Sequence, residues 1–168
     1  CTSISIAEGM KSHKKIFIMT PASLKANFFS ELKKCGDHMY KKNQFWEFVS
    51  TDGTPEYVDA LTLALNISTQ HIVDNHGAWL VDVSKESNFE SLSPHEQNAI
   101  DEQINMMIRS KYTDINYNGI NMQKMSALTE NFTVNPFDHT VVVIDEAHNF
   151  VSRIVNKLPK KPPTSGAK

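Results

Sequence analysis

Short apolar runs and apolar residues at helical spacing alternate along this chain, and together they predict its elements. The runs predict strands at residues 16–19, 45–48, 78–83, 112–117 and 141–144, the second being a strand or an ordered packed segment. The helical spacing predicts helices at residues 2–10, 21–35, 55–65, 69–75, 94–108, 121–130 and 148–158. Because strands and helices alternate, the sequence predicts an α/β fold with a mostly parallel sheet flanked by helices.

Capping signals mark the ends of several predicted helices. Thr20 and Pro21 fit the N-cap and first position of one helix, and Gly36 can close it. Ser93 and Glu96 form a capping box for another helix. The helical side chains predicted to face the core are Ile4, Ala7, Met10, Leu24, Phe28, Leu32, Val58, Leu61, Leu65, Ile100, Ile104, Met107, Ile108, Phe150, Val151, Ile154, Val155 and Leu158.

The run of four apolar residues at 141–144 leads directly into Asp145 and Glu146, and His148 follows. Such a run is typical of a parallel strand buried on both faces. The carboxylates then stand at the carboxyl end of the strand, where open α/β sheets bind ligands. Buried unpaired carboxylates are costly, and a magnesium–nucleotide complex would explain them, with Asp145 holding Mg²⁺ and Glu146 orienting the attacking water. An acidic N-cap on the next helix is the simpler alternative.

Composition limits the classes of protein that fit. The chain has 168 residues, 40% hydrophobic and 21% charged, with a formal net charge of −2. These values are typical of one globular domain, and they predict that nucleic-acid contacts come from local patches instead of a bulk basic field. No apolar run predicts a membrane span. Cys1 and Cys35 are too few for a disulfide framework or a zinc site, which favours a reducing, intracellular compartment.

Three segments carry a family resemblance. Residues 143–153 contain Asp-Glu-Ala-His and look like helicase motif II, residues 16–24 look like motif Ia, and residues 115–119 stand where motif Ib is expected. The chain therefore resembles the first RecA-like domain of a superfamily 2 DEAD/DEAH-box helicase, a P-loop NTPase fold. It looks closest to the helicase-like NTPases of nucleocytoplasmic large DNA viruses. Residues 38–88 carry no such motif and are interpreted as an insertion.

The resemblance implies ATP and Mg²⁺ as cofactors and assigns roles at motif II. Asp145 would hold Mg²⁺, partly through water, and Glu146 would be the catalytic base. His148 would couple the nucleotide state to a second RecA-like domain, its alternative being an ordinary surface or packing residue.

The same resemblance implies contacts to a DNA or RNA backbone, which position the strand without reading its sequence. Helix capping and turn formation are the alternative roles of these residues. The implied contacts are Thr20, Pro21, Ser23, Lys25, Asn118 and Gly119. Tyr117, Phe45 and Trp46 are interpreted as core residues, with base stacking as the alternative.

The chain departs from the family in one motif. It has no Gly-x-x-x-x-Gly-Lys-[Ser/Thr] loop, the segment that cradles phosphates. We therefore expect residues 1–158 to be an N-terminally truncated RecA-like domain, residues 159–168 to be a flexible tail or linker, and this piece alone to show negligible ATP turnover.

Several functions remain open at this point. The leading one is an ATP-dependent nucleic-acid helicase or translocase that works with a second RecA-like domain. The alternatives are a viral transcription NTPase that translocates without unwinding, a degenerate nucleic-acid-binding module, and the motor of a restriction or repair enzyme. A viral transcription machinery would then be a partner, and the virion or the host cytoplasm would be the location.

Overall fold

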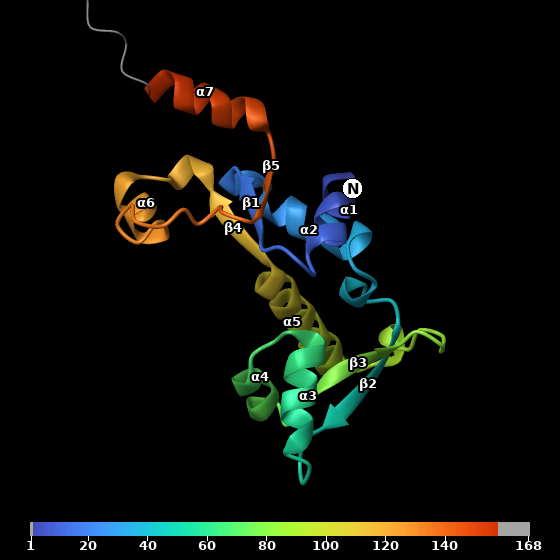
Figure 1. Ribbon diagram of the computed structural model, residues 1–168. Helices are drawn as coiled ribbons and strands as arrows, with labels where there is room; N and C mark the ends of the chain where they lie inside the picture. The colour runs from blue at the N-terminus through green and yellow to red at the C-terminus, as the bar shows by residue number, and fades with distance from the viewer. Residues whose placement is uncertain (1, 158–168) are drawn as a thin grey trace, which may run out of the picture.

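The computed structural model describes residues 2–157 and forms two sheets of different kinds (Figure 1). The first is a three-stranded parallel sheet in the order β4 (Tyr112–Asn116), β1 (Ile16–Thr20), β5 (Val141–Ile144). The second is an antiparallel pair, β2 (Phe45–Ser50) with β3 (Gly77–Asp82). The α/β class and the parallel sheet are confirmed, whereas the predicted strands at 45–48 and 78–83 belong to the antiparallel pair.

The central strand, β1, is buried along its whole length. Ile16 pairs with Tyr112 on one side and with Val141 on the other, so both edges of β1 are hydrogen-bonded. Strands enclosed on both faces read as continuous apolar runs. The apolar run at 16–19 therefore predicted this strand correctly.

Two helices pack together beside the parallel sheet, α1 (Thr2–Met10) and α2 (Lys25–Cys35). Their buried side chains include Ile4, Ala7, Phe28 and Leu32, as the helical spacing predicted. Met10, in contrast, is 40% exposed, because α1 ends there and the chain turns toward β1.

The start of α2 differs from the prediction. Thr20 is the last residue of β1 and is paired with Asn116, so it does not cap a helix. A short 3-10 turn, η1 (Ala22–Leu24), follows Pro21, and α2 begins only at Lys25. Its end is as expected, since the backbone N–H of Gly36 donates to the carbonyl of Leu32.

Helices α3 (Glu56–Leu65) and α4 (Thr69–Asp74) connect β2 to β3 and contact each other. In Figure 1 this antiparallel lobe lies at the end of the molecule away from the parallel sheet. The predicted helices at 55–65 and 69–75 are both present, with Ser68 capping α4 through the amide of His71. The 3-10 turn η2 (His38–Tyr40) precedes the lobe in sequence, and η3 (Phe89–Ser91) lies in its last part.

Side-chain amides occupy the open edges of the antiparallel pair. Asn88 accepts from the backbone N–H of Trp46 at 2.8 Å and donates to its carbonyl at 3.0 Å. Gln103 does the same for Trp79, at 2.8 and 2.7 Å. Because unpaired strand edges expose backbone groups, these two amides complete the hydrogen bonding that a further strand would otherwise supply.

The longest helix, α5 (Pro94–Lys111), joins the lobe to the parallel sheet. Its predicted capping box is present, with Ser93 and Glu96 exchanging hydrogen bonds. The predicted stripe of Ile100, Ile104, Met107 and Ile108 is buried. This helix therefore begins where the sequence placed it and packs on the predicted face.

The last part of the described chain is less enclosed than predicted. After β4 come the turn η4 (Tyr117–Gly119), helix α6 (Met122–Leu128), strand β5 and helix α7 (Ala147–Lys157). In β5, Val142 and Ile144 are 37% and 36% exposed, because β5 is the edge strand of the sheet. The expectation of a strand buried on both faces is therefore wrong.

Helix α7 also departs from the expected packing. Val151, Ile154 and Val155, predicted to face the core, are exposed, because α7 extends away from the body of the fold (Figure 1). Leu158 and the proposed tail at 159–168 lie outside the described residues. Among residues 2–157, no helix is long and apolar enough to cross a membrane.

Cys35, at the end of α2, is disulfide-bonded in the structure. The cysteine count therefore gives no support for a reducing compartment, which stays a prediction.

Candidate functional site

The strand β5 ends in a tight turn that carries the two adjacent carboxylates. The backbone N–H of Asp145 donates to the carbonyl of Met19 at 2.9 Å, which extends the pairing of β5 with β1 by one residue. Glu146 then adopts a positive φ of 52°, which is uncommon outside glycine. Helix α7 begins directly afterwards at Ala147. The turn therefore places Asp145 at the carboxyl end of the strand, as the sequence predicted.

Local hydrogen bonds orient the side chains of this turn. The Oδ1 atom of Asp145 accepts from the backbone N–H of Glu146 at 3.1 Å, and Nδ1 of His148 lies 3.3 Å from Oε2 of Glu146. An N-cap side chain bonds to the second or third amide of the helix, whereas the Asp145 contact is to the adjacent amide before α7. The structure therefore shows a strand-end carboxylate at Asp145, with Glu146 and His148 exposed beside it.

Tyr117 ties the end of β4 to this turn. Its hydroxyl lies 3.2 Å from the carbonyl oxygen of Asp145 and 3.3 Å from that of Glu146, and can donate to either. Its ring packs edge-on against Phe150 at 5.4 Å. Burial, and then the negative charges of Asp145 and Glu146, raise the pKa of Tyr117. The core role interpreted from the sequence fits, but its contact with the carboxylate turn was missed because sequence spacing does not show which strand ends meet.

A pocket of about 230 Å³ opens beside Asp145. One wall is the end of β5, and another is the first turn of α1 with Ser3 and Ile4. The third wall comes from α2, with Asn27, Phe28 and Glu31. Because backbone N–H groups at the start of a helix point toward anions, the pocket combines a carboxylate with the kind of helix end that binds phosphate.

Metal binding in this pocket would need ligands besides the described side chains. Within residues 2–157, no group of three or more His, Cys, Asp and Glu side chains is arranged to hold a metal ion. Mg²⁺ commonly takes only one or two protein carboxylates and completes its shell with water and substrate phosphates. Asp145 fits that role, so a Mg²⁺ ion here would depend on the nucleotide for most of its ligands.

The predicted nucleic-acid residues of the first segment differ in accessibility. Thr20 is 2% exposed and Pro21 is buried, while Ser23 and Lys25 are exposed on the surface. The Nζ atom of Lys25 lies 2.6 Å from Oδ2 of Asp114, so its charge is already paired on one side. Ser23 and Lys25 are therefore the side chains of this segment that reach solvent.

The second predicted segment lies at the same edge of the sheet. Because β1 and β4 are parallel and Thr20 pairs with Asn116, the residues after each strand emerge together. Asn118 is exposed and Gly119 half-buried, and the side chain of Asn116 accepts from the amide of Asn118 at 3.0 Å. The structure therefore brings the two segments to one edge, and the local bonding of Asn118 is that of a turn.

A second pocket contains a basic residue that the sequence analysis did not single out. Arg109 and Asn105 of α5 line it together with Lys25 of α2, in a volume of about 330 Å³. The available signal was the basic last turn of α5 next to the motif Ib strand, but nothing in the sequence showed that α5 lies against α2.

Comparison with known proteins adds one partial similarity. No known protein family and no solved structure matches the chain. Over 41 residues the chain is 56% identical to a protein of Acanthamoeba polyphaga mimivirus named "Putative ATP-dependent RNA helicase R563". That stretch is 24% of this chain and only 7% of the viral protein. The chain is thus similar, over about a quarter of its length, to part of a viral protein that is named as an RNA helicase.

Proposed function

We propose that this chain supplies the Walker B carboxylates of a RecA-like motor domain in an ATP-dependent helicase or translocase. The observation that carries the proposal is the pocket that Asp145, at the end of a parallel strand, lines together with Ser3 and Ile4 of the first turn of α1. A carboxylate and a helix start that line the same pocket suit a magnesium–nucleotide complex. The partial similarity to a viral helicase supports the same class of function.

In this proposal, bound Mg²⁺–ATP supplies the phosphoryl group that water attacks. Asp145 would hold the metal, and Glu146 would accept a proton from the attacking water. His148, 3.3 Å from Glu146, links that carboxylate to a second RecA-like domain. Tyr117 is a positioning residue, since its hydroxyl contacts the carbonyls of the turn and no reacting group.

The nucleic-acid strand would follow the edge where β1 and β4 end. Ser23 and Lys25 reach solvent on one side of that edge, and Asn118 and Gly119 on the other. Arg109 adds a cation beside Lys25. Thr20 and Pro21, being buried, would act through the backbone geometry of the turn that they form.

Other parts of the full-length protein would complete the motor. The chain has no phosphate-cradling Gly-Lys-[Ser/Thr] loop, and the matched stretch is 7% of the viral relative. We propose residues 1–158 as part of the first RecA-like domain, with the phosphate loop and the second domain outside these 168 residues. DNA or RNA and, in a virus, the transcription machinery are the proposed partners.

The test is nucleic-acid-stimulated ATP hydrolysis by the full-length gene product. We expect Glu146→Gln to lower kcat about 100-fold or more, the usual contribution of a general base, while ATP binding persists. Glu56→Gln, an exposed carboxylate on α3 in the other lobe, is the matched control and should leave kcat unchanged. Equal turnover of Glu146→Gln and the unaltered protein would sink the proposal.

A strand-displacement assay on the same protein separates the two motor functions. Duplex unwinding coupled to ATP hydrolysis identifies a helicase. ATP hydrolysis stimulated by nucleic acid without strand displacement identifies a translocating NTPase of the transcription type.

A further inference from the structure

The antiparallel lobe carries a pocket built around two aromatic rings. Phe48 of β2 and Trp79 of β3 are direct partners in the register, so their side chains stand on one face of the strand pair. Their rings meet edge-on with centroids 5.3 Å apart. Phe48 is 41% exposed, which leaves part of its ring open to solvent.

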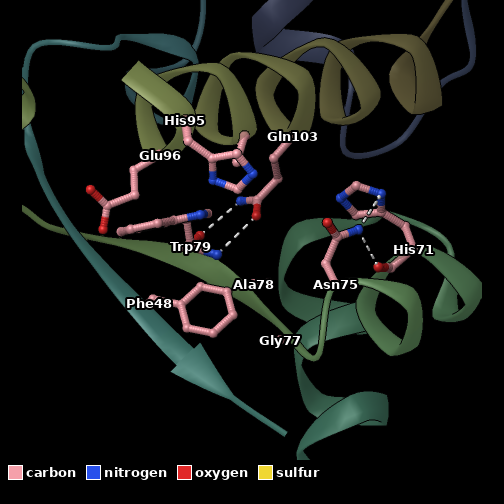
Figure 2. Close-up of a pocket in the computed structure, with 10 residues that line it drawn as sticks. Phe48, His71, Asn75, Gly77, Ala78, Trp79, His95, Glu96 and Gln103 are labelled. Atoms are coloured by element: carbon pink, nitrogen blue, oxygen red, sulfur yellow. Dashed lines mark hydrogen bonds between the residues drawn. The ribbon is translucent and has the colours of Figure 1, made fainter. Parts of the chain in front are cut away.

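Helices α4 and α5 complete the walls around these rings, in a volume of about 280 Å³. Figure 2 shows His95 and Glu96 in the first turn of α5, His71 in α4, and Asn75 directly after α4. The pocket therefore joins aromatic surface to one carboxylate, in a segment that contains no helicase motif.

Hydrogen bonds within the protein hold several lining residues of the pocket in place. Gln103 of α5 accepts from the backbone N–H of Trp79 and donates to its carbonyl, as the dashed lines in Figure 2 mark. The Nδ2 atom of Asn75 lies 2.8 Å from the carbonyl of His71. Hydrogen bonds from the Ser93 side chain and then from its backbone lower the pKa of Glu96, which keeps this carboxylate ionised at neutral pH.

Charge is strongly segregated along the chain, and the lobe is its acidic part. Residues 43–99 have one basic residue, Lys85, and nine acidic ones, a formal net charge of −8. Lys85 is already paired, at 3.1 Å from Asp82 and 3.9 Å from Glu47. The acidic residues of the lobe are Glu47, Asp52, Glu56, Asp59, Asp74, Asp82, Glu86, Glu90 and Glu96.

We propose that this aromatic pocket binds an arginine side chain from a basic segment of a partner protein. A guanidinium group stacks on aromatic rings and bonds to carboxylates in one plane. Phe48 and Trp79 provide the rings, and Glu96 provides the carboxylate. The surrounding negative charge attracts a basic segment and steers it to the pocket.

The same charge argues against a nucleic-acid base as the occupant. Aromatic rings also stack bases, but each base brings a phosphate, and phosphates are repelled by a lobe of net charge −8. The proposal does not depend on the NTPase function, because the pocket residues are on α4, α5 and the β2–β3 pair, away from the end of β5.

The experiment titrates the full-length protein with a short peptide of alternating Arg, Gly and Ser, and with the same peptide carrying neutral citrulline for Arg. Trp46 is buried outside the pocket, so the part of the fluorescence change that is absent from Trp79→Phe reports occupancy. We expect saturable binding of the Arg peptide. The citrulline peptide should bind roughly threefold to thirtyfold more weakly, which is the range that a cation–π contact supplies.

Two variants locate the binding. Phe48→Leu removes a π face but keeps an apolar side chain, and Glu96→Gln removes the charge while Gln can still serve the capping box. Each should weaken the Arg peptide roughly threefold or more, whereas the control Glu90→Gln, an exposed acid of the lobe outside the pocket, should change binding much less. The proposal would be overturned by equal affinity for the two peptides or by unchanged binding of the Arg peptide to Phe48→Leu. It would also be overturned if a single-stranded oligonucleotide, and not the Arg peptide, quenched Trp79.

Discussion

At the scale of single residues, the hydroxyl of Tyr117 holds the turn that carries both carboxylates. It reaches the carbonyls of Asp145 and Glu146 from the end of a different strand. The glutamate has a positive φ, which costs energy and needs support from its surroundings. The position of Asp145 at a strand end was predictable from the apolar run before it. The role of Tyr117 was not, because it depends on which strands are neighbours.

Tyr117→Phe tests this support. The substitution keeps the ring against Phe150 but removes the hydrogen-bond donor. We expect a loss of about 1 kcal/mol in the free energy of unfolding, measured by urea titration. In the full-length protein, kcat for ATP should fall more than KM rises, because the carboxylates lose their fixed position. Tyr57→Phe, on an exposed tyrosine of α3, should change neither quantity, and an equal effect at both positions would contradict the assigned role.

At the scale of elements, a cluster of charged and phenolic groups joins α1 to β4 and to the loop after α2. Lys11 lies 2.5 Å from Glu8 and also bonds to Asp37, while Tyr112 donates to Glu8. Burial raises the pKa of Tyr40, whose ring is beside Lys11, to about 12. These contacts connect segments far apart in sequence, so the cluster stabilises the packing of α1 and of the loop after α2 against β4.

The cluster predicts how stability depends on pH. Burial alone would raise the pKa of Asp37, but hydrogen bonds from Lys11 and the Met39 amide outweigh it and lower that pKa below the ordinary 3.8. Burial alone would lower the pKa of Lys11, but its bonds to Asp37 and Glu8 raise it above 10.5. Because the pKa of Asp37 is lowered on folding, its contacts stabilise the fold above pH 3.8, and this stabilisation is lost as the pH falls further. Because the pKa of Lys11 is raised, its contacts stabilise the fold below pH 10.5, and this stabilisation is lost as the pH rises further.

We therefore expect Asp37→Asn to remove about 1 kcal/mol of stability at neutral pH and to flatten the decline on the acid side. The measurement is the free energy of unfolding from urea titrations at several pH values. Asp59→Asn, on an exposed carboxylate of α3, is the control. An acid limb of the same slope in Asp37→Asn would show that this contact does not set the pH dependence.

Helices and strands were predictable where the sequence pattern is local, as in a cap or an apolar stripe. They were less predictable where the pairing of distant strands decides the structure. The capping box and the apolar stripe of α5 are both present as predicted. The antiparallel pairing of β2 with β3 was not foreseen, because an apolar run does not encode the direction of its partner strand. Thr20 fitted an N-cap by type, but its place in the β1 ladder took precedence.

At the scale of the whole molecule, the fold separates two regions with different chemistry. The parallel sheet brings the ends of β1, β4 and β5 together, where the proposed nucleotide and nucleic-acid residues stand. The antiparallel lobe carries the acidic aromatic pocket at the other end of α5 (Figure 1). The motifs in the sequence predicted the first region. Charge counts along the chain could have indicated the second, but the ring pair needed the strand register.

The central claim is that Asp145 binds the metal of a magnesium–nucleotide complex in the pocket between β5 and the first turn of α1. A crystal structure of the full-length protein with Mg²⁺ and a non-hydrolysable ATP analogue tests it most directly. We expect phosphates at the start of α1 and a Mg²⁺ ion held by the Asp145 carboxylate, directly or through water. A nucleotide bound elsewhere, with Asp145 facing only solvent, would contradict it.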